Sequence, residues 1–161
     1  MRHVPHGADP RVRPRPPGDN RWQRGDVVDA LYLADEEATI WAEWYRQLAE
    51  RGLLPLRQLP RDVWSYRVHR LDVADLSTLN RLARVGLDPP TPGRKGWPRY
   101  QNVGETLWKE GWRGLLAPSA ARADGLVLCL LVDDRAVLPV EPVAPPRVVT
   151  EPPVPPTGMR T

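Results

Sequence analysis

One acidic residue, Glu43, occupies a position from which a helix side chain can reach a cleft. The apolar residues around it recur at helical spacing and predict one buried stripe, formed by Ile40, Trp41, Trp44, Tyr45 and Leu48. At about 100° per residue, Glu43 lies about 60° from Ile40, on the shoulder of that stripe. A carboxylate placed there can act on a bound molecule without being buried in the core. The alternative is an ordinary solvent-facing helix glutamate.

Serine and metal chemistry find no support in the spacing of the remaining reactive residues. No Gly-x-Ser-x-Gly elbow surrounds Ser119. The histidines, His3, His6 and His69, have neither the i,i+4 spacing nor the cysteine partners of a zinc site. The single cysteine, Cys129, cannot form an intramolecular disulfide, which favours a reducing compartment. We therefore expect no metal and no serine nucleophile.

Length and charge are those of a small globular protein with a mild basic excess. The chain has 161 residues and a formal net charge of +3, from 23 basic and 20 acidic residues. Several arginines near the start alternate with prolines, which predicts a solvated arm rather than a nucleic-acid-binding stripe. No apolar run is long enough to span a bilayer, and the first residues lack the apolar core of a signal peptide. We expect a cytoplasmic protein of one domain.

The elements that must carry these residues follow from local patterns. Residues 27–34 form an apolar run that predicts a buried strand. Asp35 is a good N-cap for the helix that carries Glu43, and Gly52 is a good stop for it. Downstream we expect strands at 62–72, 114–117 and 126–132, and helices at 76–85, capped by Asp75, and at 99–110, ending at Gly111. This mixed order favours an α+β fold with a small mixed or antiparallel sheet flanked by helices.

The C-terminal residues 138–161 are rich in proline and have almost no periodic apolar pattern. Proline fixes φ and removes a backbone donor, so the segment is expected to be a disordered tail that joins neither a helix nor a ladder. The domain is accordingly predicted to cover residues 1–137, and the tail to be dispensable for folding.

Four blocks in a fixed order resemble the RES domain family, named for its Arg, Glu and Ser. Residues 20–25 read Asn-Arg-Trp-Gln-Arg-Gly, and Leu-Tyr-Leu-Ala follows within 30–34. Residues 38–43 end on the glutamate, and 111–122 contain Gly-x-x-Gly, a strand and a serine. The resemblance covers about residues 2–133. It implies a fold like that of the diphtheria-toxin-type ADP-ribosyltransferases and an enzyme that acts on NAD⁺.

The resemblance also implies site residues. Arg2 and Arg21 would pair with the pyrophosphate of NAD⁺, because the guanidinium fork matches phosphate oxygens. Tyr32 would lay its ring against nicotinamide, Glu43 would stabilise the cation that develops on the ribose, and Ser119 would bond ribose or nicotinamide. Each has a plain structural alternative: local pairing for Arg21, core filling for Tyr32, turn capping for Ser119.

Two positions depart from the family pattern. Asn20 stands where glycine is common, which is a mild change in a turn. Only Met1 precedes Arg2, so either the first strand is incomplete or translation starts upstream in nature. The histidine that follows Arg2, His3, is a further candidate to line the site, and otherwise it is a loop histidine.

The activity implied by the resemblance is cleavage of the nicotinamide–ribose bond through an oxocarbenium-like state, as in glycoside cleavage. The enzyme would be a glycohydrolase, a phosphorylase or an ADP-ribosyltransferase, with NAD⁺ as substrate and no cofactor. Such proteins commonly act as toxins beside a helix-turn-helix antitoxin. The sequence leaves the oligomeric state open, and a homodimer is one possibility. The alternative is a non-catalytic, degenerate RES domain or an arginine-rich nucleic-acid-binding module.

Overall fold

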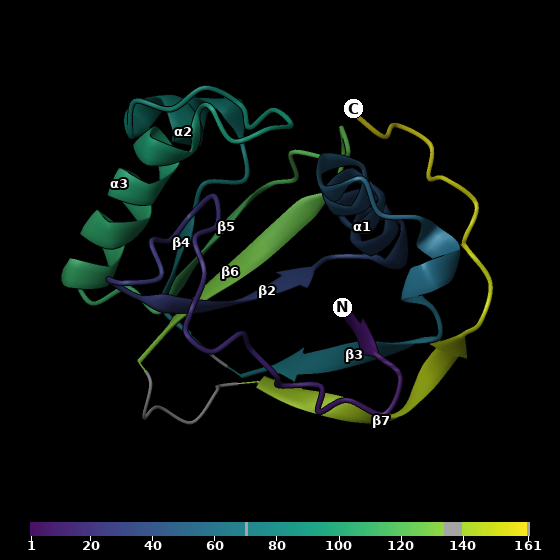
Figure 1. The fold of residues 1–161 in the computed structure, drawn as a ribbon. Coiled ribbons are helices and arrows are strands. Elements are labelled where there is room, and N and C mark those ends of the chain that lie inside the picture. The colour runs from purple at the N-terminus through teal and green to yellow at the C-terminus, as the bar shows by residue number, and fades with distance from the viewer. Residues whose placement is uncertain (70, 134–139, 161) are drawn as a thin grey trace.

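The computed structural model describes residues 1–69, 71–133 and 140–160, and its strands form two sheets (Figure 1). The larger sheet has the order β2-β6-β5-β4, and β4 and β5 alone in it run parallel. These strands are β2 (Asp29–Ala34), β4 (Val73–Asp75), β5 (Gly114–Pro118) and β6 (Leu126–Val132). The apolar runs predicted at 27–34, 114–117 and 126–132 therefore become three adjacent strands. The short strand β4 was not predicted.

The second sheet is antiparallel and has the order β1-β3-β7. Its strands are β1 (Arg2–Pro5), β3 (Arg61–Val68) and β7 (Val140–Val149). Strand β3 confirms the strand predicted at 62–72 as far as Val68, where it ends. The two sheets, with helices beside them, confirm the α+β fold class.

Helix α1 (Glu37–Arg51) carries Glu43 and begins almost where the sequence indicates. Its N-cap is Glu36 rather than the predicted Asp35, because both carboxylate oxygens of Asp35 are used elsewhere, on the backbone N–H groups of Glu36 and Leu126. Gly52 ends the helix as predicted, with a φ of 64° that favours glycine. The apolar stripe of α1 packs on Val63 of β3 and Val149 of β7.

Two further α-helices cover the larger sheet. Helix α2 (Leu79–Arg84) is shorter than the predicted 76–85 and is capped by Thr78, whose side chain accepts from Arg81 N–H. The predicted cap, Asp75, instead ends β4 and accepts from Ser77. Helix α3 (Trp97–Lys109) begins two residues before the predicted start, and a short 3₁₀ turn, η1 (Pro55–Gln58), leads into β3.

The prediction of a disordered C-terminal tail is wrong for residues 140–149, which form β7. The strand lies at the edge of its sheet, where proline is tolerated because one side of the strand needs no ladder donors. Pro145 and Pro146 fall between Val143 and Arg147, where the register with β3 shifts, so neither interrupts a paired position. Val140 and Val149 are buried. The predicted domain boundary at 137 lies outside the described residues.

Three buried clusters hold these layers together. One joins α2 and α3 to the larger sheet and contains Leu82, Leu107 and Leu115. One lies under α1, and a third, with Leu31 and Val140, joins the two sheets. None of the described helices is both long and apolar enough to cross a membrane.

Candidate active site

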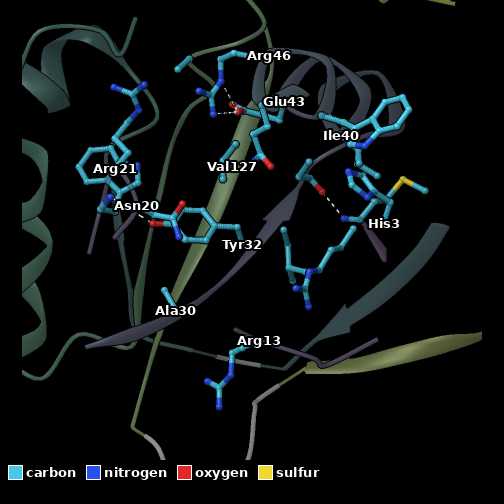
Figure 2. A pocket seen from close by; sticks show the side chains of 18 of the residues that line it. His3, Arg13, Asn20, Arg21, Ala30, Tyr32, Ile40, Glu43, Arg46 and Val127 are labelled. Carbon is cyan, nitrogen blue, oxygen red and sulfur yellow. Dashed lines mark hydrogen bonds and ion pairs between the residues drawn. The ribbon is translucent and has the colours of Figure 1, made fainter. Parts of the chain in front are cut away.

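A cavity of about 350 Å³ lies beside α1, β2 and the start of β1 (Figure 2). This volume is at the lower end of the range of small-molecule sites. Among the described residues that line it, Glu43 is the one acid, and the basic residues are His3 and the arginines Arg2, Arg13, Arg21, Arg46, Arg51 and Arg61. The lining is therefore suited to a ligand that carries negative charge.

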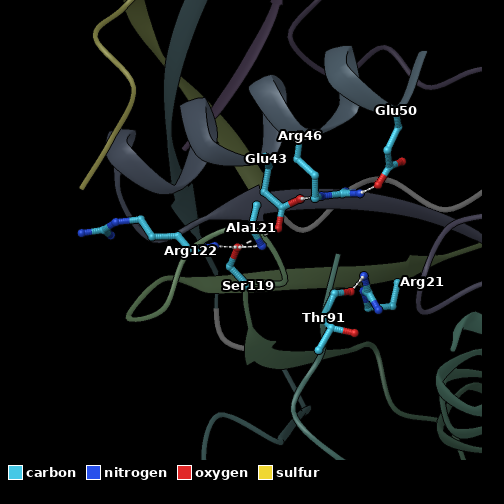
Figure 3. A network of polar contacts seen from close by, with 8 residues as sticks. All are labelled: Arg21, Glu43, Arg46, Glu50, Thr91, Ser119, Ala121 and Arg122. Carbon is cyan, nitrogen blue, oxygen red and sulfur yellow. Dashed lines mark hydrogen bonds and ion pairs between the residues drawn. The ribbon is translucent and has the colours of Figure 1, made fainter. Parts of the chain in front are cut away.

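Glu43 is held on both of its carboxylate oxygens (Figure 3). Its Oε1 accepts a hydrogen bond from Ser119 Oγ at 2.7 Å. Its Oε2 accepts from Nε and Nη2 of Arg46, at 3.1 and 2.9 Å. The side chain is 21% exposed and, in Figure 2, points from α1 toward the ring of Tyr32. The shoulder position predicted from the helical spacing thus places the carboxylate at the cavity.

Ser119 lies directly behind Glu43, after the end of β5, and is 1% exposed. Its hydroxyl donates its one proton to Glu43 and accepts from the backbone N–H groups of Ala121 and Arg122, at 3.0 and 3.2 Å. A serine hydroxyl has one donor and two acceptor sites, so all three are used. Ser119 therefore reaches the cavity through Glu43, and it is not among the residues that line it.

The turn that carries Arg21 is fixed to helix α3. Gln101 Nε2 donates to the carbonyl oxygens of Asn20 and Gln23, at 3.0 and 3.2 Å. Gly104 allows a close approach, because a Cβ there would lie 2.0 Å from the carbonyl oxygen of Trp22. The contact between helix and turn depends on the absence of a side chain at this position.

The guanidinium of Arg21 makes fewer hydrogen bonds than the carboxylate of Glu43. It stacks over the ring of Tyr100 at 5.2 Å, and its Nη2 donates to the carbonyl oxygen of Thr91 at 2.6 Å. No carboxylate among the described residues lies within ion-pair distance of it. Burial lowers the pKa of Arg21, and the neighbouring charge of Arg46 lowers it further. Arg21 thus keeps most of its N–H donors for a ligand.

Tyr32 lies between these two groups on β2, with its ring in the cavity lining. Its hydroxyl oxygen accepts from the backbone N–H of Trp22 at 3.3 Å, and Cys129 lies directly opposite on β6. Burial raises the pKa of Tyr32 well above its ordinary value, and burial likewise raises the pKa of the Cys129 thiol to about 12. Both groups therefore stay protonated near neutral pH, and the tyrosine offers a fixed ring face.

Arg2 and His3 enter the cavity lining from β1, which pairs with β3 along its four residues. Arg2 donates to the carbonyl oxygens of Pro10 and Val12, at 3.1 and 2.6 Å, so part of its guanidinium holds the following loop. The Nδ1 of His3 accepts from Nε of Arg61 at 2.6 Å. Burial, followed by the charges of Arg61 and Arg2, lowers the pKa of His3 to about 3, so His3 is neutral near pH 7.

Four lining arginines were not found from the sequence: Arg13, Arg46, Arg51 and Arg61. Arg46 stands three residues after Glu43, a spacing that on a helix usually indicates a surface ion pair. Arg13 is 9% exposed and pairs with Asp29 at 3.2 Å, although it lies in the proline-rich segment that was interpreted as a solvated arm. The Asp29 partner of Arg13 and the burial of Arg46, which is 11% exposed, both come from the tertiary fold.

The arrangement combines a fixed carboxylate, an aromatic face and an open guanidinium around one cavity. Such a site can hold a phosphate-bearing ligand at the guanidinium and stabilise positive charge that develops near the carboxylate. No group of three or more His, Cys, Asp or Glu residues suited to a metal ion occurs in the described part of the chain.

Comparison with known proteins agrees with this geometry. Residues 2–151 match the model of the RES domain. Relatives named NAD(+) phosphorylase MbcT, from Mycobacterium bovis and Mycobacterium tuberculosis, are 29% identical over 113 residues, or 67% of this chain. The matched region spans 59% of the length of those relatives.

The fold is also similar to that of a solved structure. The crystal structure of the M. tuberculosis MbcT–MbcA toxin–antitoxin complex contains a chain with a TM-score of 0.77 and 21% sequence identity. The similarity covers 92% of this chain and 81% of that one, and at this identity it shows the fold alone. Because the family model spans nearly all of the chain, including β7, the protein belongs to the RES domain family.

Proposed function

We propose that this protein degrades NAD⁺ by cleaving its nicotinamide–ribose bond. One observation carries the proposal: Glu43, fixed by Ser119 and Arg46, points at the ring of Tyr32 in a cavity that Arg21 also lines. These are the residue types that the bond cleavage requires. The names of the MbcT relatives support the same substrate.

The residues divide the reaction between them. Arg21, with its free donors, holds the diphosphate, and Tyr32 presents its ring to the nicotinamide. The bond from ribose C1 to the nicotinamide nitrogen breaks, and its electron pair leaves with neutral nicotinamide. Positive charge then develops at C1, where the carboxylate of Glu43 stabilises it. Because nicotinamide is a good leaving group, no general acid is needed. NAD⁺ is the substrate, and the proposal includes no cofactor.

The acceptor we propose is inorganic phosphate. An attacking water would need a base, and the described residues of the cavity include no good candidate for one. The carboxylate of Glu43 is engaged on both oxygens, and His3 has a pKa of about 3. A phosphate anion needs no such base and is attracted by the arginine-rich lining. One of its oxygens forms the new bond to C1, which gives ADP-ribose 1-phosphate. The name of the MbcT relatives agrees with this acceptor.

In the cell, we propose a cytoplasmic toxin that a separate antitoxin protein neutralises. The support is the similarity in fold to the MbcT–MbcA toxin–antitoxin complex. An enzyme that consumes NAD⁺ depletes the supply of its own cell, so a partner that closes the cavity would protect that cell. Co-expression of the neighbouring gene would test this part directly, through recovery of growth.

The experiment that tests the function measures products. Purified protein is incubated with NAD⁺ in a phosphate-free buffer and again with added orthophosphate, and nicotinamide, ADP-ribose and ADP-ribose 1-phosphate are separated by chromatography. We expect nicotinamide release that rises with phosphate, with the phosphorylated sugar as co-product. The Glu43→Gln variant, purified in parallel, controls for a contaminating enzyme. If folded wild-type protein releases no nicotinamide, the proposed function is wrong. If ADP-ribose forms at the same rate without phosphate, the acceptor is water.

A further inference from the structure

Arg46 contributes more to the site than its position on a helix surface suggests. It lies three residues after Glu43 on α1, and its side chain is 11% exposed. Its Nε and Nη2 both contact one oxygen of Glu43, and its Nη1 donates to Glu50 on the next turn. Figures 2 and 3 both show its guanidinium between Glu43 and the side of the cavity where Arg21 lies. The arginine is thus fixed at both ends of its planar group.

The direction of these bonds decides how Glu43 is oriented. Because both nitrogens of Arg46 donate to Oε2, the other oxygen, Oε1, is left to accept from Ser119. Ordering a glutamate side chain costs rotamer entropy, so one hydrogen bond alone fixes it poorly. An exposed pair of this kind contributes little. Here both partners are mostly buried, at 11% and 21% exposure, and screening by solvent is reduced.

We propose that Arg46 is a positioning residue for the proposed NAD⁺-cleaving reaction: together with Ser119 it holds the carboxylate of Glu43 in the orientation that faces the ribose. The catalytic consequence rests on the proposed function, but the positioning does not. Arg46 acts through Glu43, and the bonds that hold it in place come from its own helix.

Two other roles for Arg46 predict different results. A positive charge beside Glu43 weakens the field of the carboxylate at the ribose carbon, so a purely electrostatic effect would make the enzyme faster once Arg46 is removed. A direct contact with substrate phosphate would instead raise KM and leave kcat alone. If Arg46 positions Glu43, removing Arg46 lowers kcat, because an incorrectly placed carboxylate no longer stabilises the transition state.

The first test needs no turnover. Crystal structures of the wild type and of Arg46→Met are compared at Glu43. We expect Glu43 to lose its contact with Ser119 Oγ, or to occupy more than one rotamer, in the variant. A single Glu43 rotamer with the 2.7 Å contact to Ser119 intact in Arg46→Met would overturn the proposal, whatever the protein does with NAD⁺. Should the variant not fold, Arg46→Gln, which removes the charge and the paired nitrogens that hold Glu43, is used in the same comparison.

The second test is a double-mutant cycle in kcat. Arg46→Met is expected to lower kcat about 10- to 100-fold with KM changed less than about threefold. In a Glu43→Gln background the same change should cost less than about threefold, because the group that Arg46 positions is already lost. Arg46→Lys should recover most of the rate. Glu50→Gln removes the charge at the other end of Arg46 while keeping an acceptor there and the pair with Glu43. It serves as the matched control, with an expected loss under about twofold.

The outcomes separate the two proposals. If the wild type does not cleave NAD⁺, the proposed function fails and the crystal comparison still decides the role of Arg46. If the wild type is active but Arg46→Met is equally costly in both backgrounds, acts only on KM or raises kcat, the positioning role is wrong and the proposed function stands.

Discussion

The two walls of the cavity differ in how fully their charged groups are engaged. On the α1 wall, the Glu43 carboxylate accepts three hydrogen bonds from Ser119 and Arg46. On the opposite wall, the turn at 20–23 is firmly held by α3, but the guanidinium of Arg21 has a single hydrogen bond, to Thr91. One wall fixes a functional group, and the other fixes only the backbone that carries it.

This difference fits a division of labour between chemistry and binding. A group that stabilises a transition state gains from being ordered before the substrate arrives, because no reorganisation is then needed during the reaction. A group that binds a phosphate gains from keeping its donors free until the ligand satisfies them. We therefore expect changes on the α1 wall to act on kcat and changes on the Arg21 wall to act on KM.

The largest expected effect comes from Glu43→Gln. The amide keeps the shape and some of the hydrogen bonding but lacks the charge, which matters most when the ribose becomes cationic. We expect kcat for nicotinamide release to fall about 10²–10³-fold, or about 3–4 kcal/mol, with KM changed only slightly. Circular dichroism and thermal melting check the fold. A folded variant with near-normal kcat would remove Glu43 from the chemistry.

Ser119→Ala should give the next largest effect. The change removes the hydrogen bond to Glu43 Oε1 and leaves two backbone N–H groups, of Ala121 and Arg122, without their acceptor. We expect kcat to fall about tenfold, with KM nearly constant, because Ser119 does not line the cavity. Steady-state kinetics measure both constants. A rise in KM with unchanged kcat would mean that Ser119 contacts the substrate directly.

Gly104→Ala tests the other wall at a distance from the substrate. A Cβ at this position would lie 2.0 Å from the carbonyl oxygen of Trp22, so the turn that carries Arg21 must shift. We expect KM for NAD⁺ to rise severalfold and the melting temperature to fall by several degrees, with kcat less affected. Gly96→Ala, at the N-cap of the same helix, is the matched control, since its Cβ would meet only the Tyr100 side chain at 3.4 Å. Equal KM values for both variants would contradict this account of the turn.

The smallest effect concerns His3 and acid stability. The pKa of His3 is about 3 in the folded protein and 6.5 in the unfolded chain, so the unfolded chain binds the extra proton between these values. Stability contributed by the neutral ring is therefore present above pH 6.5 and is lost as the pH falls toward 3. In urea unfolding at pH 7 and pH 4.5, His3→Gln should lose less stability on acidification than the wild type. Equal losses would show that His3 titrates normally.

The sequence predicted those parts of the site that depend on local spacing. The apolar stripe of α1 places Glu43 at the cavity, and the run at 27–34 becomes β2 with Tyr32 facing inward. The order of motifs predicted that Arg21 and Ser119 lie near Glu43, although the direct bond from Ser119 to Glu43 was not foreseen, since 76 residues separate them. The resemblance of the ordered motifs to the RES pattern was enough to predict the family.

Other features depend on contacts that no local pattern contains. The prolines of 140–149 argue against a strand, and only the edge position and the register shift beside β3 make β7 acceptable. In the sequence, Arg46 resembles an ordinary helix-surface arginine. Its role follows only from its burial and from the bond between its partner Glu43 and Ser119. Thr78 caps α2 in place of the predicted Asp75, because Asp75 is the last residue of β4.

Binding of intact NAD⁺ to slowed variants tests the division between the two walls most directly. In the Glu43→Gln protein, the substrate survives long enough for its Kd to be measured by calorimetry. A second protein combines Glu43→Gln with Arg21→Met. We predict that Glu43→Gln binds NAD⁺ with a Kd within about threefold of the wild-type KM, and that adding Arg21→Met weakens binding about tenfold or more, because a charge-assisted bond to phosphate is lost. If Glu43→Gln alone abolishes NAD⁺ binding, or if Arg21→Met leaves the Kd unchanged, the division of the cavity into a chemical wall and a binding wall is wrong.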